Sequence, residues 1–134
     1  MQSITIDSLC LSYVKDTSAK VVIKLDVEGA ELPALVGAKR LLQERETLVV
    51  YEENLEDPES KASDYVLKDL GYEVYYCTEK YRIVRMAALS DIQDIKARTT
   101  INWNTNCNFF ACSPTSTFSQ MFDEMTYKGS NHLC

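Results

Sequence analysis

Carboxylates gather at two points of the sequence where an apolar segment ends. The segment KLDVEGAE carries one group, which is Asp26, Glu28 and Glu31 around Gly29. The segment TLVVYEE ends in the other group, Glu52 and Glu53. A carboxylate can take a proton from a hydroxyl, orient a polar ligand or bind a hard cation such as Mg²⁺. The spacing therefore predicts a polar site if the two groups meet in space.

The elements around these carboxylates indicate that they do meet. Residues 21–27 (VVIKLDV) and 47–53 are apolar and β-branched, which predicts two strands covered on both faces. Residues 30–44 repeat apolar side chains at steps of three and four, which predicts one amphipathic helix. Pro33 fits its first turn, where a missing N–H costs nothing. Strand and helix alternate, so the expected fold is an open α/β sheet, in which ligands bind outside the carboxyl ends of the strands.

The remaining segments continue this alternation. A helix through 65–70 should end at Gly71, and strands are expected at 72–77 and 108–113. Asp7 is expected to cap a short N-terminal helix, and Ser90 is expected to cap a second short helix that begins directly after it. Residues 80–100 are harder to interpret, and YRIVRM, residues 81–86, suits a strand extension. We expect one domain over residues 1–114, followed by a polar, loosely ordered tail over residues 115–134.

Composition narrows the class of protein. The chain has 134 residues and a net charge of −6, so its surface repels phosphate backbones and argues against a nucleic-acid partner. It has no apolar run that would span a membrane and no signal peptide pattern, which predicts a cytoplasmic protein. Five cysteines without tight spacing fit reduced thiols. Cys107 and Cys112 suggest a metal pair, but no second Cys or His pair completes a zinc site, so we expect no metal.

The central segment IKLDVEGAELPALVGAKRLLQERETLVVYEE resembles the FkbM-type family of S-adenosylmethionine-dependent methyltransferases. The positions that match the family pattern are Lys24, Asp26, Val27, Glu28, Gly29, Ala30, Glu31, Leu35, Gly37 and Ala38. The upstream TIDSL and the later LGYEVYY and NFFACSP are similar to other segments of the family. The resemblance extends over roughly residues 3–114.

The resemblance implies a Rossmann-like, mainly parallel sheet flanked by helices. The family sheet has strand order 3-2-1-4-5-7-6, and the matching segments correspond to the block 4-5-7-6. The glycine-rich turn that cradles the cofactor is not among the four glycines of this chain. The expected fold is therefore a partial class I methyltransferase fold that lacks the N-terminal strands. The strand 21–27 would then be an edge, open to self-association or to docking of an N-terminal half.

The resemblance also implies a function, the transfer of a methyl group from S-adenosylmethionine to a hydroxyl of a small molecule, sugar or lipid. Asp26 and Glu52 are the expected catalytic residues, as base and acceptor-orienting group, because His132, the only histidine, lies in the polar tail. Asp26 and Glu28 are the expected cofactor contacts. For Asp26 and Glu28 the alternative is a structural role beside the following helix, and for Glu31 that role is favoured.

Without the glycine turn we expect the chain to bind S-adenosylmethionine poorly and to be active only with the missing half. Two alternatives remain. One is a non-catalytic binding or assembly module derived from the same fold. The other is a flavodoxin-like receiver with Asp26 as phosphoacceptor, which leaves the run Glu-Gly-Ala-Glu unexplained.

Overall fold

The structure is a computed structural model that describes residues 3–102 and 106–130; His132 lies outside this part of the chain. Its elements in chain order are α1 (Ile6–Tyr13), β1 (Val21–Leu25), α2 (Glu31–Val36), α3 (Lys39–Glu44), β2 (Thr47–Glu52), α4 (Lys61–Asp64), a π-helical turn η1 (Tyr65–Asp69), β3 (Glu73–Cys77), β4 (Ile83–Met86), α5 (Leu89–Ile101), β5 (Asn108–Cys112) and α6 (Thr117–Ser130).

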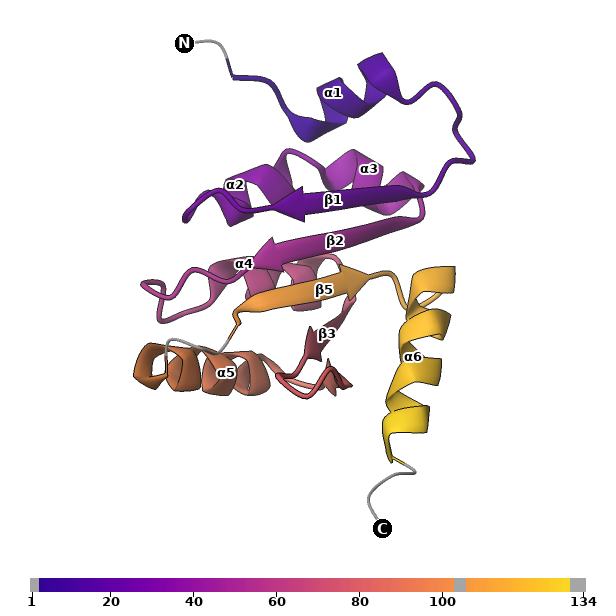
Figure 1. The fold of residues 1–134 in the computed structure, drawn as a ribbon. Coiled ribbons are helices and arrows are strands. Elements are labelled where there is room, and N and C mark those ends of the chain that lie inside the picture. Colours follow the sequence, from indigo (N-terminus) through magenta and orange to yellow (C-terminus); the bar gives the residue numbers. More distant parts are fainter. Residues whose placement is uncertain (1–2, 103–105, 131–134) are drawn as a thin grey trace.

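The strands form one sheet with the order β1-β2-β5-β3-β4 (Figure 1). The first four reproduce the expected block 4-5-7-6, and β1 lies parallel to β2 with Val21 beside Thr47, as predicted. The expectation of a mainly parallel sheet is wrong. β5 runs antiparallel to both β2 and β3, and β4 returns antiparallel to β3 as a separate hairpin strand. The sheet is mixed because β5, the last strand in the sequence, lies between β2 and β3 and runs in the opposite direction to both.

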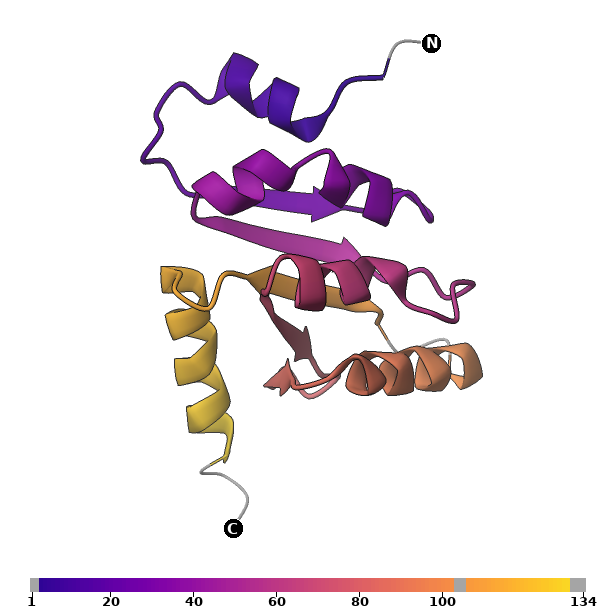
Figure 2. The ribbon, with the colours of Figure 1, turned by 180° about the vertical axis from the view of Figure 1, so that it is seen from behind.

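One face of the sheet carries the main core. Val49, Tyr51 and Phe109 are fully buried on this face, together with Leu35 and Ile92 from the helices. Figure 2 shows α2, α3 and α4 on this side of the strands. The prediction that β1 is covered on both faces is wrong, because its burial alternates and Val22 is 61 % exposed on the other face. The helix that packs on that face in the described part of the chain contacts Tyr75 and Cys112, in β3 and β5, and leaves β1 uncovered.

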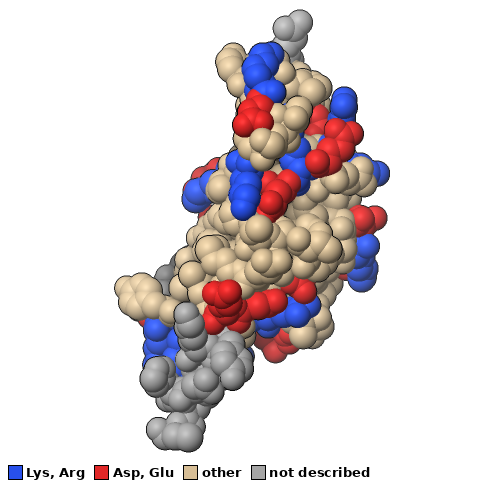
Figure 3. All heavy atoms as spheres, turned by 90° about the vertical axis from the view of Figure 1, so that its right-hand side faces the viewer, with Lys and Arg blue, Asp and Glu red and all other residues tan. Residues whose placement is uncertain are grey.

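That helix is α6, in the segment expected to be a loosely ordered tail. Phe118 and Phe122, spaced by four, lie on one side of α6 and pack against Tyr75 and Cys112 of the sheet. The rings of Phe122 and Tyr75 stack with centroids 4.7 Å apart. The polar composition of the segment obscured this two-residue apolar stripe. Figure 3 views this side of the molecule and shows a broad uncharged band below a region where acidic and basic side chains are intermingled.

The expected helix 30–44 is two helices, α2 and α3, separated at Gly37 and Ala38. The break gives α3 an N-terminus of its own. Asp7 caps that terminus rather than its own helix: its carboxylate accepts hydrogen bonds from the N–H of Arg40 (3.1 Å) and Leu41 (2.9 Å). The side chain of Thr5 caps α1 instead.

The start of α5 differs from the prediction, whereas the helix end at Gly71 agrees with it. α5 is longer than expected, and Ser90 lies inside it; the carboxylate of Asp91 accepts from the N–H of Ala87 and Ala88 at its start. The helix through 65–70 does stop at Gly71, whose φ of +63° favours glycine.

Candidate functional site

An acidic hollow of about 440 Å³ opens at the carboxyl ends of β1 and β2. The structure brings all three sequence-predicted residues to it, since Asp26, Glu28 and Glu52 line the same wall. Three further carboxylates join them, those of Glu31, Glu53 and Glu56. Parallel pairing of β1 and β2 places these two strand ends at one edge of the sheet. The acidic hollow is therefore the meeting point that the sequence predicted.

Asp26 does not cap the following helix. Its carboxylate lies 3.0 Å from the ammonium of Lys24 and is 60 % exposed. The residue before α2 is Ala30, and no side chain caps that helix by a hydrogen bond to its first turn. The structural alternative for Asp26 was a helix cap, and this geometry gives it no support. Its exposed carboxylate, paired with Lys24, lies at the edge of the hollow.

Glu31 has the structural role that its position suggested. Its side chain is 3 % exposed and accepts hydrogen bonds from the backbone N–H of Val27 (3.3 Å) and Gly29 (2.9 Å). Both donors belong to the turn between β1 and α2. Charge-assisted bonds of this kind are stronger than neutral ones, so Glu31 fixes the turn that forms one wall of the hollow.

The turn has a strained backbone at Glu28. The N–H of Ala30 donates to the carbonyl of Val27, and the two residues between them have positive φ, +48° at Glu28 and +98° at Gly29. A positive φ is uncommon for a residue other than glycine. A Cβ on Gly29 would also lie 3.1 Å from the side-chain nitrogen of Asn54 across the hollow. Strain of this sort is typical of ligand sites and turns the Glu28 side chain outwards.

Glu52 and Glu53 are neighbours in sequence but point to opposite faces of the sheet. Glu52 is half-buried and lies opposite Asn108, and its carboxylate makes no hydrogen bond or ion pair with another described residue. Glu53 is 1 % exposed and accepts a short hydrogen bond from Ser63, whose hydroxyl also contacts that of Tyr51. Glu52 is thus the free carboxylate and Glu53 the buried one.

Sequence reasoning missed the buried pair that Glu53 forms with Lys96 of α5. The Lys96 ammonium lies 3.9 Å from Glu53 Oε1, which has no hydrogen-bond partner among the described residues. The same ammonium donates a hydrogen bond to Ser60 Oγ at 3.0 Å. Burial raises the pKa of the Glu53 carboxyl, while the Ser63 hydrogen bond and the Lys96 charge oppose this rise. The position of Lys96, four residues after the buried Ile92, is the signal that could have revealed it.

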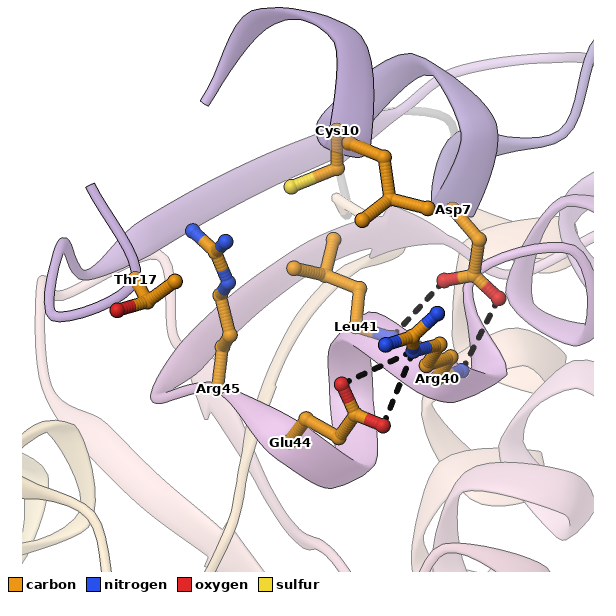
Figure 4. Close-up of a pocket in the computed structure, with 8 residues that line it drawn as sticks. Asp7, Cys10, Thr17, Arg40, Leu41, Glu44 and Arg45 are labelled. Atoms are coloured by element: carbon orange, nitrogen blue, oxygen red, sulfur yellow. Dashed lines mark hydrogen bonds and ion pairs between the residues drawn. The ribbon is translucent and has the colours of Figure 1, made fainter. Parts of the chain in front are cut away.

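A second hollow, of about 170 Å³, lies between α1 and α3, and each of its charged side chains has a partner (Figure 4). The carboxylate of Asp7 caps α3 from one side. Arg40 pairs with Glu44 at 3.0 Å. The guanidinium of Arg45 donates to the carbonyl of Asp16 at 2.9 Å. Because these polar groups satisfy one another, we interpret this hollow as a joint between two helices.

The described residues were also compared with what a metal site, a reactive thiol and a membrane-spanning helix require. No group of three His, Cys, Asp or Glu side chains there is arranged to hold a metal ion. Cys107 and Cys112 are both buried free thiols, and Cys107 donates to the hydroxyl of Thr99 at 3.0 Å. Burial raises the pKa of Cys112 to about 11. Among the helices of residues 3–102 and 106–130, none combines the length and apolar character that crossing a membrane requires.

Comparison with known proteins gives one match. No curated protein and no solved structure matched the chain. The family description Methyltransferase FkbM domain matches residues 1–74, which extend from the N-terminus through α1, β1, β2 and η1 to the start of β3. This region is more than half of the sequence and contains every residue of the acidic hollow. The chain therefore belongs to the FkbM methyltransferase family.

Proposed function

We propose that this chain is the acceptor-side half of an S-adenosylmethionine-dependent O-methyltransferase, and that the acidic hollow holds the cationic end of the donor. The observation that carries the proposal is the concentration of six carboxylates at the strand ends, in the segment that matches the family. The donor carries a positive sulfonium and an ammonium group, and such charges are stabilised by nearby carboxylates.

The residues at the hollow suit this end of the donor. The strained turn at Glu28 directs a carboxylate outwards, and Gly29 leaves room for backbone to approach a ligand closely. Glu53 Oε1 is a buried oxygen without a hydrogen-bond partner in the described chain, which leaves one acceptor for a donor group or a water. Asp26 and Glu28 are the residues proposed to contact the ammonium and sulfonium charges.

Methyl transfer to oxygen needs a group that removes the hydroxyl proton. When bound, S-adenosylmethionine supplies a methyl group that is already activated for transfer. Glu52, which has no described partner, is free to orient the acceptor hydroxyl. Asp26 lines the same hollow and is proposed to accept the proton. The acceptor itself is a small molecule, sugar or lipid with a free hydroxyl group.

The nucleoside part of the donor needs residues from elsewhere. None of the four glycines of the chain forms a glycine-rich turn, so the half that binds the nucleoside is proposed to dock at β1. β1 is an edge strand, and its Val22 is 61 % exposed. Pairing of another strand with this edge, from a complementing half or from a second copy, would satisfy its open backbone N–H and C=O groups.

A probe that carries only the cationic end of the donor tests the hollow in this chain alone. We expect S-methylmethionine, a sulfonium amino acid, to shift the NMR signals of residues 26–31 and 52–56 at millimolar concentration. Methionine has the same backbone charges without the sulfonium and should shift them several-fold less. Equal shifts for both compounds, or shifts outside these segments, would refute the proposed donor contact.

A transfer assay tests the roles of the carboxylates. With a complementing half that supplies the glycine turn, Asp26→Asn should lower methyl transfer about a hundredfold, the usual loss on removal of a general base. Asp69→Asn, at an exposed position of η1 outside the hollow, is the matched control and should retain full activity. Unchanged transfer in Asp26→Asn would remove Asp26 from the mechanism and favour the assembly-module alternative.

A further inference from the structure

A third hollow, of about 590 Å³, lies between the β3–β4 turn and the end of α5, and nothing in the proposed methyl transfer uses it. Its charged lining residues are three cations, Lys80, Arg82 and Arg98, and one carboxylate, Glu79. We name it the basic hollow. It is unusual on a chain whose net charge is −6. Because β3 runs parallel to β2, the basic hollow opens at the same edge of the sheet as the acidic hollow.

The cations of the basic hollow have no described partner. All three side chains are exposed, and none forms an ion pair with another residue of the described chain. Together with Glu79 they leave two net positive charges around the opening. Arginine and lysine in such a group bind phosphate well, the first through its planar fork and the second as a point charge.

The basic hollow also has apolar lining residues. Ile95 and Ile101 come from α5, the helix that carries Arg98, and Tyr76 comes from β3. Ile101 is 85 % exposed, so a large apolar side chain stands beside the cations without any cover from the described chain. A ligand that joins an anion to a short apolar segment would contact both kinds of lining residue at once.

The turn that carries two of the cations is held in place. The N–H of Thr78 donates to the carbonyl of Arg82 at 2.8 Å, and the N–H of Tyr81 donates to the carbonyl of Thr78 at 2.9 Å. The hydroxyl of Thr78 accepts a third bond, from the N–H of Arg82. Lys80 and Arg82 therefore project from a backbone that is ordered before any ligand arrives, which lowers the entropy cost of binding.

From these observations we propose that the basic hollow binds an alkyl phosphate, a phosphate monoester with a short apolar chain. Two net positive charges match the charge of about −2 that a phosphate monoester carries at neutral pH. A monocarboxylate would leave part of the positive charge unneutralised. The proposal does not depend on methyl transfer, since it uses neither the acidic hollow nor the methyl donor.

Binding of hexyl phosphate, measured by NMR titration of the chain, tests the proposal. We expect saturable shifts confined to residues 78–82 and 95–102. Inorganic phosphate, which has the charge without the chain, and hexanol, which has the chain without the charge, should each bind at least fivefold more weakly. Hexyltrimethylammonium should not shift these signals. Equal affinity for all four compounds, or shifts elsewhere, would overturn the proposal.

Charge removal gives a second readout. Arg98→Gln and Lys80→Gln should each weaken hexyl phosphate about three- to fivefold, the usual effect of one exposed ion pair. Lys39→Gln removes the same charge from an exposed position on α3 and should leave the affinity unchanged. All three positions are exposed, so the variants are expected to fold. Weakening by Lys39→Gln equal to that of the other two would reduce the binding to a general charge effect and refute the site.

Discussion

The carboxylate of Asp7 accepts a hydrogen bond from the backbone N–H of Leu41, with Oδ1 and N 2.9 Å apart, although the two residues are 34 positions apart in the chain. Its other oxygen accepts from the N–H of Arg40. The N-terminal helix α1 thus supplies the cap of α3, and the hydrogen bond from Asp7 N–H to the carbonyl of Gly37 adds a backbone contact at the same joint.

This joint yields a first prediction. Asp7→Ala removes both capping bonds and should lower the free energy of unfolding by about 1 kcal/mol, the usual loss for a helix cap. Asp16→Ala provides a comparison, since among the described residues the carboxylate of Asp16 accepts hydrogen bonds only from Ser18 in its own loop. Denaturant unfolding measures both. A loss no larger in Asp7→Ala than in Asp16→Ala would contradict the capping role.

The turn at the acidic hollow yields a second prediction. Gly29→Ala should cost about 1–2 kcal/mol from its positive φ, and more from the contact of the new Cβ with Asn54. Gly71→Ala has a positive φ of +63° but no atom within 4 Å of the new Cβ, so it measures the backbone cost alone. Thermal unfolding of the pair should show the larger loss for Gly29→Ala. An equal loss would mean that Asn54 does not pack against the turn.

Glu31 provides a third prediction. Glu31→Ala leaves the N–H groups of Val27 and Gly29 without their acceptor and should lower the free energy of unfolding by about 1–3 kcal/mol. Glu28→Ala removes an exposed carboxylate from the same turn and should have a much smaller effect on stability. If the two variants lose the same stability, the turn does not rest on Glu31.

The buried carboxyl of Glu53 gives a fourth prediction, on pH. Burial raises its pKa above the ordinary 4.5, so between 4.5 and the raised value the folded chain holds a proton that the unfolded chain has released. This group therefore lowers the free energy of unfolding as pH rises through that window. Glu53→Gln cannot titrate, so its stability relative to the unaltered chain should increase over the window.

Glu56→Gln, an exposed position in the same loop, is the control for that measurement and should follow the unaltered chain at every pH. Urea unfolding at several pH values from 4 upwards, on the order of one pH unit apart, would give the profiles. Parallel profiles for Glu53→Gln and the unaltered chain would show that Glu53 does not hold its proton on folding.

A fifth prediction concerns the chain without a complement. Calorimetry should detect no saturable binding of S-adenosylmethionine, because the cationic end alone leaves too little contact to offset the lost freedom of the ligand. The edge at β1 should favour self-association, which Val22→Lys should reduce in sedimentation experiments, while Val36→Lys, at a valine 51 % exposed on α2, should not. Micromolar cofactor binding by a monomer would overturn both expectations.

Several features of the fold follow from short stretches of sequence. The apolar runs at Val21–Leu25 and Thr47–Glu52 specify strands, and the helical period between them forces a crossover, which makes the strands parallel neighbours. From that arrangement it follows that Asp26 and Glu52 share one edge. Gly71 ends its helix for an equally local reason, its positive φ.

Features that depend on distant partners were not predictable in this way. The predicted mainly parallel sheet was wrong about β5, because an apolar run has the same pattern whether its strand is parallel or antiparallel to its neighbours. The sequence prediction also missed α6, because the two phenylalanines of this helix, Phe118 and Phe122, pack against Tyr75, which is distant in sequence.

The sequence by itself determined the strands β1 and β2, a helical segment between them and the meeting of two acidic strand ends, because periodicity and chain connectivity are local properties. Only the tertiary structure decided which carboxylate does what. It buried Glu53 against Lys96, assigned Glu31 to the turn and sent Asp7 to a helix 34 residues away. The physical reason is that a carboxylate has the same chemistry everywhere in the chain, and its charge, partners and role come from the groups that folding places around it.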